Sequence, residues 1–318
     1  MKTIVPIVLI IGIIVGVYFH KRLGLYKITS IRYVVLGIMV ISIIACLTVV
    51  YTNASTSKNT YGWHTEYMQY KELHEVASGK GQKIALIDSG LSSFQVNDKR
   101  TTSVSLVNGE IDENGHGTMM YSLIRGYENS IMGIAPEAEI IAIKVMSEDE
   151  EIKPAIIKEA IQLAVTKGAT IISLSLGSYN ENEEIKELII ESIEKGITFV
   201  SSTGDYESAD MLFPAKMKDV ISVGSLSANL EVSHFTNAAS EATIIAPGDE
   251  IKSIGIDKKV QYTSGTSQAT AIISGYIALI KEKAMDNGFP LDNQKIIKLL
   301  ESINKKELTY LDALLSIQ

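Results

Sequence analysis

Cysteine is almost absent from this chain: among 318 residues there is a single one, Cys46. One thiol excludes an intramolecular disulfide framework and a zinc site built from cysteines. A basic surplus is missing as well, because 29 Lys and Arg residues stand against 37 Asp and Glu residues, a formal net charge of −8. This balance argues against a nucleic-acid-binding protein, which usually has a basic surface. A disordered polypeptide is excluded too, since 46% of the residues are hydrophobic.

Acidic residues are missing altogether from residues 1–65. Residues 1–52 carry five basic residues, so the remaining 24 basic and 37 acidic residues give residues 53–318 a net charge of −13. Two uncharged apolar runs lie in the basic segment, Thr3–Phe19 and Tyr33–Tyr51. A membrane-spanning helix needs about 20 apolar residues, with a range of roughly 17–25. Both runs are therefore long enough to be membrane spans.

The residues between the two runs hold four of the five basic residues, and positively charged loops stay on the cytoplasmic side of a membrane. We therefore predict a membrane hairpin at 1–52, with transmembrane helices at 3–19 and 33–51 in contact with membrane lipid. A linker at 53–60 and a domain at 61–318 would follow on the extracytoplasmic side of the cell membrane.

Two alternatives for the N-terminal segment stay open at this point. In the first alternative, the apolar run at 3–19 is a cleaved signal peptide. The absence of a small-residue cleavage site after this run argues against it. The residues Ile43–Cys46 resemble a bacterial lipobox, which would make Cys46 a lipidated N-terminus. The apolar run continues beyond Cys46, which favours an ordinary membrane-helix cysteine.

Strand-like and helix-like segments alternate along residues 61–318. Strands are expected in the short apolar runs at 83–87, 140–146, 170–176, 197–201, 220–223 and 243–245. Helices are expected at 154–167, 183–195 and 267–283. This alternation predicts an α/β fold with a parallel sheet that helices cover on both faces. In such sheets, functional sites form at the carboxyl ends of the strands.

Three polar side chains lie at such positions. Asp88 directly follows the strand at 83–87, His116 lies in a Gly-rich segment that opens a helix, and Ser267 begins the long helix. These residue types allow nucleophilic acyl transfer, in which His116 takes the Ser267 proton and Asp88 orients the imidazole. The backbone N–H of Ser267, at a helix N-terminus, would serve the developing oxyanion. Each segment alone is a common turn or cap, but their joint occurrence favours a catalytic triad.

The sequence resembles the subtilisin-like serine protease family (subtilases) over roughly residues 61–318. The order Asp, His, Ser is the one recorded for subtilisin. The resemblance includes IALIDSGL, NGHGT and GTSQAT around the three residues, and four further blocks at 130–145, 173–178, 214–224 and 243–248. It implies a three-layer fold, with a mainly parallel sheet between helices, and a serine endopeptidase that acts on peptide or protein substrates.

The resemblance also implies a substrate-binding site. One wall would be the strand against which the substrate pairs as an extra strand, formed by Ser175, Leu176 and Gly177. The other wall, in the pocket for the residue before the scissile bond, would be formed by Ser202, Thr203 and Gly204. The short distance from the second apolar run to Asp88 also leads us to expect folding without the family's propeptide.

Asp205 is the main departure from the family pattern, because it replaces the Asn that supplies a side-chain donor to the oxyanion hole. An ionised carboxylate only accepts hydrogen bonds, which leaves open a pseudoprotease that binds peptides and cleaves them poorly. A protonated Asp205 would instead donate. Activity is the favoured hypothesis, since all three triad residues are present.

Two further features concern ions and substrates. The loop at Tyr127–Ile131 is shorter than the family's calcium-binding loop, so we expect no metal and no cofactor, although Glu128 and Asn129 offer oxygen atoms to calcium. The acidic run Glu148–Glu151 falls near the expected substrate path. This run is either a solvated acidic loop or a set of carboxylates that attracts basic substrate residues near the cleavage site.

Overall fold

The computed structural model describes residues 61–147, 152–289 and 291–317. The two predicted membrane segments, the linker at 53–60 and the acidic run at 148–151 lie outside the described residues. Among the described residues, no helix is both long and apolar enough to span a bilayer.

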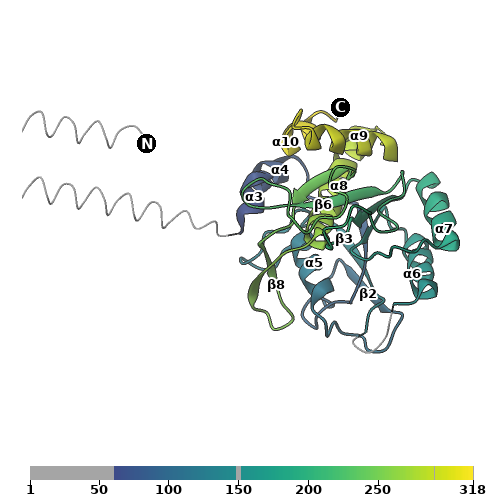
Figure 1. Ribbon diagram of the computed structural model, residues 1–318. Coiled ribbons are helices and arrows are strands. Elements are labelled where there is room, and N and C mark those ends of the chain that lie inside the picture. Colours follow the sequence, from purple (N-terminus) through teal and green to yellow (C-terminus); the bar gives the residue numbers. More distant parts are fainter. Residues whose placement is uncertain (1–60, 148–151, 290, 318) are drawn as a thin grey trace, which may run out of the picture. The chain divides into compact units, whose positions relative to one another are not determined.

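Seven parallel strands form the central sheet, in the order β2-β3-β1-β4-β5-β6-β7 (Figure 1). The strands are β1 (Lys83–Asp88), β2 (Thr101–Ser105), β3 (Glu139–Lys144), β4 (Ile171–Leu174), β5 (Thr198–Ser202), β6 (Ile221–Leu226) and β7 (Ile244–Pro247). A separate antiparallel hairpin consists of β8 (Ile251–Ile254) and β9 (Val260–Thr263). The inner strands are buried almost throughout, as expected for a parallel sheet with both faces covered.

Helices cover both faces of this sheet. Successive residues of β1 show the two faces: Ile84 and Leu86 belong to one hydrophobic core, and Ala85 and Ile87 to the other. The second core also contains α6 (Pro154–Thr166) and α7 (Glu183–Glu194), which lie together at the right of Figure 1. The first core contains α3 (Trp63–Tyr67), α4 (Tyr70–Val76), α5 (His116–Arg125), α8 (Thr266–Asp286), α9 (Asn293–Asn304) and α10 (Tyr310–Leu315). The predicted α/β fold with a parallel sheet between helical layers is confirmed.

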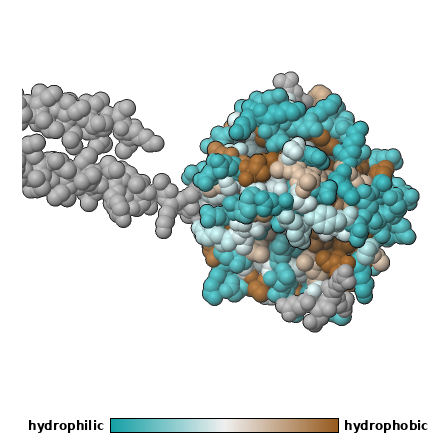
Figure 2. All heavy atoms as spheres, in the orientation of Figure 1, coloured by the Kyte–Doolittle hydropathy of each residue, from teal (hydrophilic) through white to brown (hydrophobic). Residues whose placement is uncertain are grey.

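The surface of this unit, Tyr61–Gln318, is largely polar. Hydrophilic residues cover most of the face in Figure 2, with smaller hydrophobic areas between them. The structure also contains strands that apolar runs did not predict. β2 is an edge strand of TTSVS with no buried residue, and β9 is mostly exposed, so neither needs an apolar sequence.

One buried carboxylate joins the segment before β1 to α8. Glu282 is only 8% exposed, and its Oε2 accepts hydrogen bonds from the backbone N–H groups of Ser78 at 2.7 Å, Gly79 at 2.6 Å and Lys80 at 3.0 Å. These three donors have no other described acceptor to replace the carboxylate. Glu282 therefore fixes the chain just before the strand that carries Asp88.

We expect Glu282→Ala to lower the free energy of unfolding by about 3 kcal/mol, because three N–H groups, of which that of Gly79 is buried, lose a charged acceptor. Urea denaturation monitored by circular dichroism measures this change. The matched control is Glu307→Ala, at an exposed position, which should stay within about 0.5 kcal/mol of the parent. If the urea denaturation curves of Glu282→Ala and Glu307→Ala have the same midpoint and slope, the contact made by Glu282 contributes nothing to stability.

Candidate active site

The carboxyl ends of three neighbouring strands form the site. Asp88 is the last residue of β1, Ser175 follows the end of β4, and Gly204 lies just beyond β5. β4 pairs with β1 on one side and with β5 on the other, so these ends lie next to one another. The site therefore occurs where parallel sheets of this kind bind their ligands.

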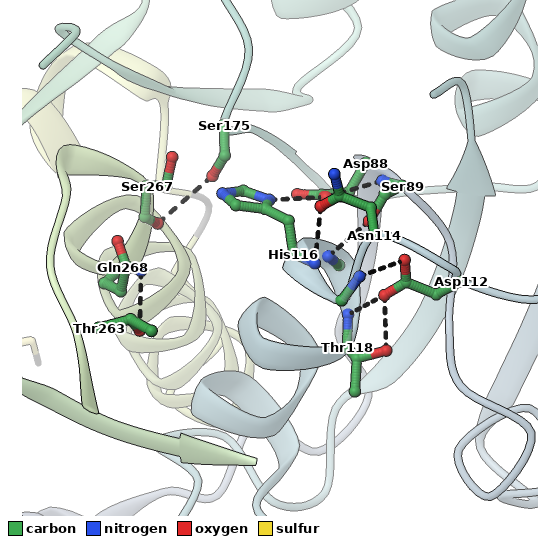
Figure 3. A network of polar contacts seen from close by, with 12 residues as sticks. Asp88, Ser89, Asp112, Asn114, His116, Thr118, Ser175, Thr263, Ser267 and Gln268 are labelled. Atoms are coloured by element: carbon green, nitrogen blue, oxygen red, sulfur yellow. Dashed lines mark hydrogen bonds and ion pairs between the residues drawn. The ribbon is translucent and has the colours of Figure 1, made fainter. Parts of the chain in front are cut away.

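His116 is hydrogen-bonded to Asp88 at the beginning of α5. The distance from His116 Nδ1 to Asp88 Oδ1 is 2.7 Å, and Asp88 is 1% exposed. Figure 3 shows the other edge of the imidazole turned toward Ser267 and Ser175. The described residues contain no hydrogen bond between the imidazole and the Ser267 hydroxyl; such catalytic contacts are often loose before substrate binds.

Nearby carboxylates raise the pKa of the His116 imidazole. Burial lowers the pKa of this imidazole, but Asp88, through its charge and its hydrogen bond, raises it, and the charges of Asp112 and Asp205 raise it further. The net pKa lies above the usual value for histidine. The site thus stabilises the imidazolium that forms when the side chain takes a proton.

Two glycines allow the approach of His116 to Asp88. Gly115, before the helix, has φ = 91°, a left-handed conformation that glycine adopts without strain. A Cβ atom added at Gly117 would lie 2.2 Å from the carbonyl oxygen of Gly90. The NGHGT sequence therefore packs the first turn of α5 against the turn that follows β1.

Asp112 holds the loop that carries His116, a role that sequence reasoning missed. This carboxylate is 2% exposed; its Oδ1 accepts from the Gly115 N–H at 2.8 Å (Figure 3). Its Oδ2 accepts from the Thr118 N–H at 2.9 Å and from the Thr118 hydroxyl at 2.6 Å. An Asp shortly before a helix start is a recognisable capping signal that could have identified it.

Ser267 is the second residue of α8 and remains partly accessible. The Ser175 hydroxyl donates to the carbonyl oxygen of Ser267 at 3.3 Å, which joins the end of β4 to this turn (Figure 3). The structure thus brings together Asp88, His116 and Ser267 from three distant parts of the sequence.

Asp205 lies at the N-terminus of α8, on an exposed position. Its Oδ1 accepts a hydrogen bond from the backbone N–H of Thr266 at 2.7 Å, directly before Ser267. The Gly204 N–H also reaches this turn, donating to Thr266 Oγ1 at 3.3 Å. A negative charge is favourable at a helix N-terminus. The carboxylate therefore stabilises the helix while presenting acceptors beside Ser267.

A cavity of about 520 Å³ adjoins these residues. Five of the six residues predicted to bind substrate line it, together with Ser267: Ser175, Leu176, Gly177, Ser202 and Gly204. Thr203 does not. It is fully buried, and its backbone N–H donates to Val223 O at 3.1 Å.

The loop at 127–131 does not fit calcium, which needs six to eight oxygen ligands. The backbones of Tyr127 and Ile131 bond each other, with N–H to O distances of 2.9 and 3.1 Å. The Ser130 carbonyl oxygen accepts from the ammonium of Lys252 at 3.0 Å. In the described ranges, no three His, Cys, Asp or Glu side chains gather into a metal site. A lysine ammonium thus already bonds one carbonyl oxygen of this loop.

We expect chelation of calcium to leave thermal unfolding unchanged within about 1 °C, because only a bound ion stabilises the native state. Lys252→Met should lower the unfolding midpoint by about 3 °C, through loss of a charge-assisted hydrogen bond. Differential scanning calorimetry with and without EDTA measures both. Lys259→Met, at a highly exposed position, is the matched control. A large drop on chelation in the parent would contradict this interpretation.

Comparisons with known proteins agree with this geometry. The model of the subtilase family matches residues 79–306. The major intracellular serine protease of Bacillus subtilis is 32% identical over 224 residues, 64% of this chain and 69% of that protein. Subtilisin BL of Lederbergia lenta is 30% identical over 227 residues, 70% of this chain and 84% of that protein. The prenylagaramide maturation protease PagA has the same fold, with a TM-score of 0.63 and 24% identity over 77% of this chain and 93% of that one.

Proposed function

Because this chain belongs to the subtilase family of serine endopeptidases, we propose that Asp88, His116 and Ser267 form its catalytic triad. The observation that carries this proposal is the 2.7 Å hydrogen bond from Asp88 to His116, with the free edge of the imidazole toward Ser267 (Figure 3). The substrate is a peptide or protein.

The chemistry proposed for these residues is acyl transfer. His116 Nε2 takes the proton of the Ser267 hydroxyl as its oxygen attacks the peptide carbonyl carbon. The imidazolium then gives that proton to the leaving amine as the peptide C–N bond breaks, which leaves an acyl group on Ser267. Water hydrolyses this ester by the reverse proton transfers. Asp88 keeps Nδ1 protonated and stabilises the imidazolium.

The proposed oxyanion site has one donor of the usual kind, the Ser267 backbone N–H, at the N-terminus of α8. Asp205 provides no second donor while ionised. Asp205 is exposed, and its carboxylate accepts a hydrogen bond from the Thr266 N–H. Both observations favour an ionised Asp205 and therefore an oxyanion site that lacks its second donor. This observation supports the second candidate function, a pseudoprotease that binds peptide segments by strand addition beside Ser175, Leu176 and Gly177.

We also propose that the domain is tethered outside the cell membrane, on the basis of the apolar runs at 3–19 and 33–51 and the basic residues between them. Digestion of intact cells with an added protease tests this arrangement. Release of the domain supports it, and protection of the domain until the cells are lysed contradicts it.

A preference for basic residues near the cleavage site is proposed from the acidic run at 148–151. Cleavage profiles of a peptide library test it. If Lys and Arg at positions upstream of the cleaved bond do not increase cleavage, the proposed preference is wrong and the acidic run has no role in substrate selection.

Labelling with a fluorophosphonate tests the triad directly, since the reagent reacts with an activated serine hydroxyl. We expect the parent chain and Ser264→Ala to be labelled, and Ser267→Ala to remain unlabelled. Ser264 is a matched control because it is exposed and lies three residues before Ser267, ahead of the first residue of α8. A parent chain that takes no label while folded would favour the pseudoprotease.

A further inference from the structure

Leu212 occupies an unusual position between the two proposed walls of the substrate site. A methyl group added at Gly177 would lie 2.7 Å from Leu212 Cβ and 2.9 Å from its Cδ1. A methyl group added at Gly204 would lie 2.9 Å from the same Cδ1 and 3.0 Å from Cγ. At Gly204 the amide nitrogen of Asn237 is nearer still, at 2.6 Å. One leucine side chain therefore lies close to the backbone of both walls.

The backbone around Leu212 is fastened to both walls. The Leu212 N–H donates to Thr203 O at 3.1 Å, on the side of β5. The next residue, Phe213, exchanges two hydrogen bonds with Ser178, of 2.8 and 3.0 Å, on the side of β4. Leu212 is 6% exposed and Phe213 is 5% exposed. Because both neighbouring segments hold this backbone, the Leu212 side chain is anchored between the two walls.

The rest of the cavity extends toward α6 and α7. Its apolar lining comes from Leu176 and from the first turns of α6 and α7, including Pro154, Ile157 and Ile185. Gly177, Gly204 and Leu212 line the same cavity, so Leu212 borders the part of it that lies between the two walls. A substrate lying along Ser175–Gly177 would thus find open space toward α6, whereas between Gly177 and Gly204 its side chain would meet Leu212.

We propose that Leu212 restricts the residue before the scissile bond to glycine or alanine. This inference rests on the proposed function for the placement of the substrate between the two walls. A larger side chain would have to displace Leu212, and overpacking of this kind is unfavourable because packed walls do not yield freely. The substrate class is therefore peptides with a small residue at the cleaved bond.

Peptide binding to the Ser267→Ala chain tests the restriction without requiring turnover. The probes are four N-acetylated pentapeptides with one sequence, in which the residue before the scissile bond is Gly, Ala, Leu or Phe. Fluorescence anisotropy competition measures their affinities, and kcat/KM on the parent chain measures cleavage of the same series. We expect Ala to be favoured over Phe by about 100-fold in both, within the range that pocket contacts supply.

Shortening Leu212 should relax the preference. In the Ser267→Ala background, Leu212→Ala should tighten binding of the Phe peptide by about 10-fold or more and leave the Ala peptide within about threefold. Leu212→Val removes one carbon, keeps most of the packing and should give an intermediate gain. Leu315→Ala, a leucine that is 54% exposed, is the matched control and should change neither affinity.

The two measurements separate the inference from the function on which it rests. Equal affinities for the Ala and Phe peptides, or an unchanged ratio after Leu212→Ala and Leu212→Val, would overturn the restriction even if the parent cleaves peptides. A strong preference in binding without any cleavage would support the restriction and would count against an active peptidase.

Discussion

Ser267→Ala is expected to abolish peptide hydrolysis, with kcat lower by on the order of 10⁶-fold, a magnitude measured on subtilisin, a member of the same family. The physical reason is that the hydroxyl of Ser267 supplies the attacking oxygen, and the hydroxyl of Ser175, which also lies beside the imidazole edge in Figure 3, donates to the Ser267 carbonyl oxygen. A chromogenic peptide with alanine before the scissile bond provides the measurement.

The control for this prediction compares single and double variants of the proposed triad. His116→Ala and the double variant His116→Ala/Ser267→Ala should be about as inactive as Ser267→Ala alone, because the residues act as one unit. Circular dichroism should show all three variants folded. Residual activity above about one hundredth of the parent value in Ser267→Ala would exclude this serine as the nucleophile.

Asp205→Asn is expected to increase kcat by about 10²–10³-fold, the range known for the corresponding donor in subtilisin. An asparagine keeps Oδ1, so the hydrogen bond from the Thr266 N–H at 2.7 Å can remain. The second carboxylate oxygen becomes an amide N–H donor, which can stabilise the oxyanion beside Ser267. Single-turnover acylation with a chromogenic peptide measures the gain at the step where the oxyanion forms.

The same substitution should move the acid limit of activity. His116 must be neutral to take a proton, so activity falls as the pH drops through its pKa. The negative charge of Asp205 contributes to the raised pKa of His116, after the larger effects of burial and of Asp88. Asp205→Asn should therefore lower this pKa and extend activity to lower pH, which a kcat/KM profile against pH will show.

Asp205→Ala separates the two effects of the carboxylate. It removes the charge without supplying a donor, so it should shift the acid limit as Asp205→Asn does while leaving kcat low. Equal kcat values for the Asn and Ala variants would refute the missing-donor explanation. Loss of the parent's activity at alkaline pH, with the activity of Asp205→Asn retained there, would show that a protonated Asp205 acts as the donor.

The apolar strands and the triad segments were predictable from the sequence because both depend on local signals. The run at 83–87 is buried between two helical layers, which requires an uninterrupted apolar stretch, and β1 follows it closely. Asp88, His116 and Ser267 each lie beside a strand or helix end, where a short motif suffices. The observed ends of the elements differ by a few residues, since end residues depend on their neighbours.

The interior of the site was less predictable because its contacts are distant in sequence. Thr203 was expected in the substrate pocket, but it is fully buried just beyond β5, while its neighbours Ser202 and Gly204 line the cavity. Leu212 has no motif of its own, and only the fold places it between Gly177 and Gly204. The role of Asp112 depends on its hydrogen bonds to the first turn of α5.

Helix α8 ties the position of Ser267, the proposed nucleophile, to the folded state of the whole domain. Its interior residues are buried along almost its whole length, and Glu282 near its far end holds the segment before β1. Amide protons in a helix surrounded in this way exchange with solvent only when most of the molecule opens. A damaged or half-unfolded molecule would therefore lose its peptidase activity together with its structure, so misfolded copies would not cleave surrounding proteins indiscriminately.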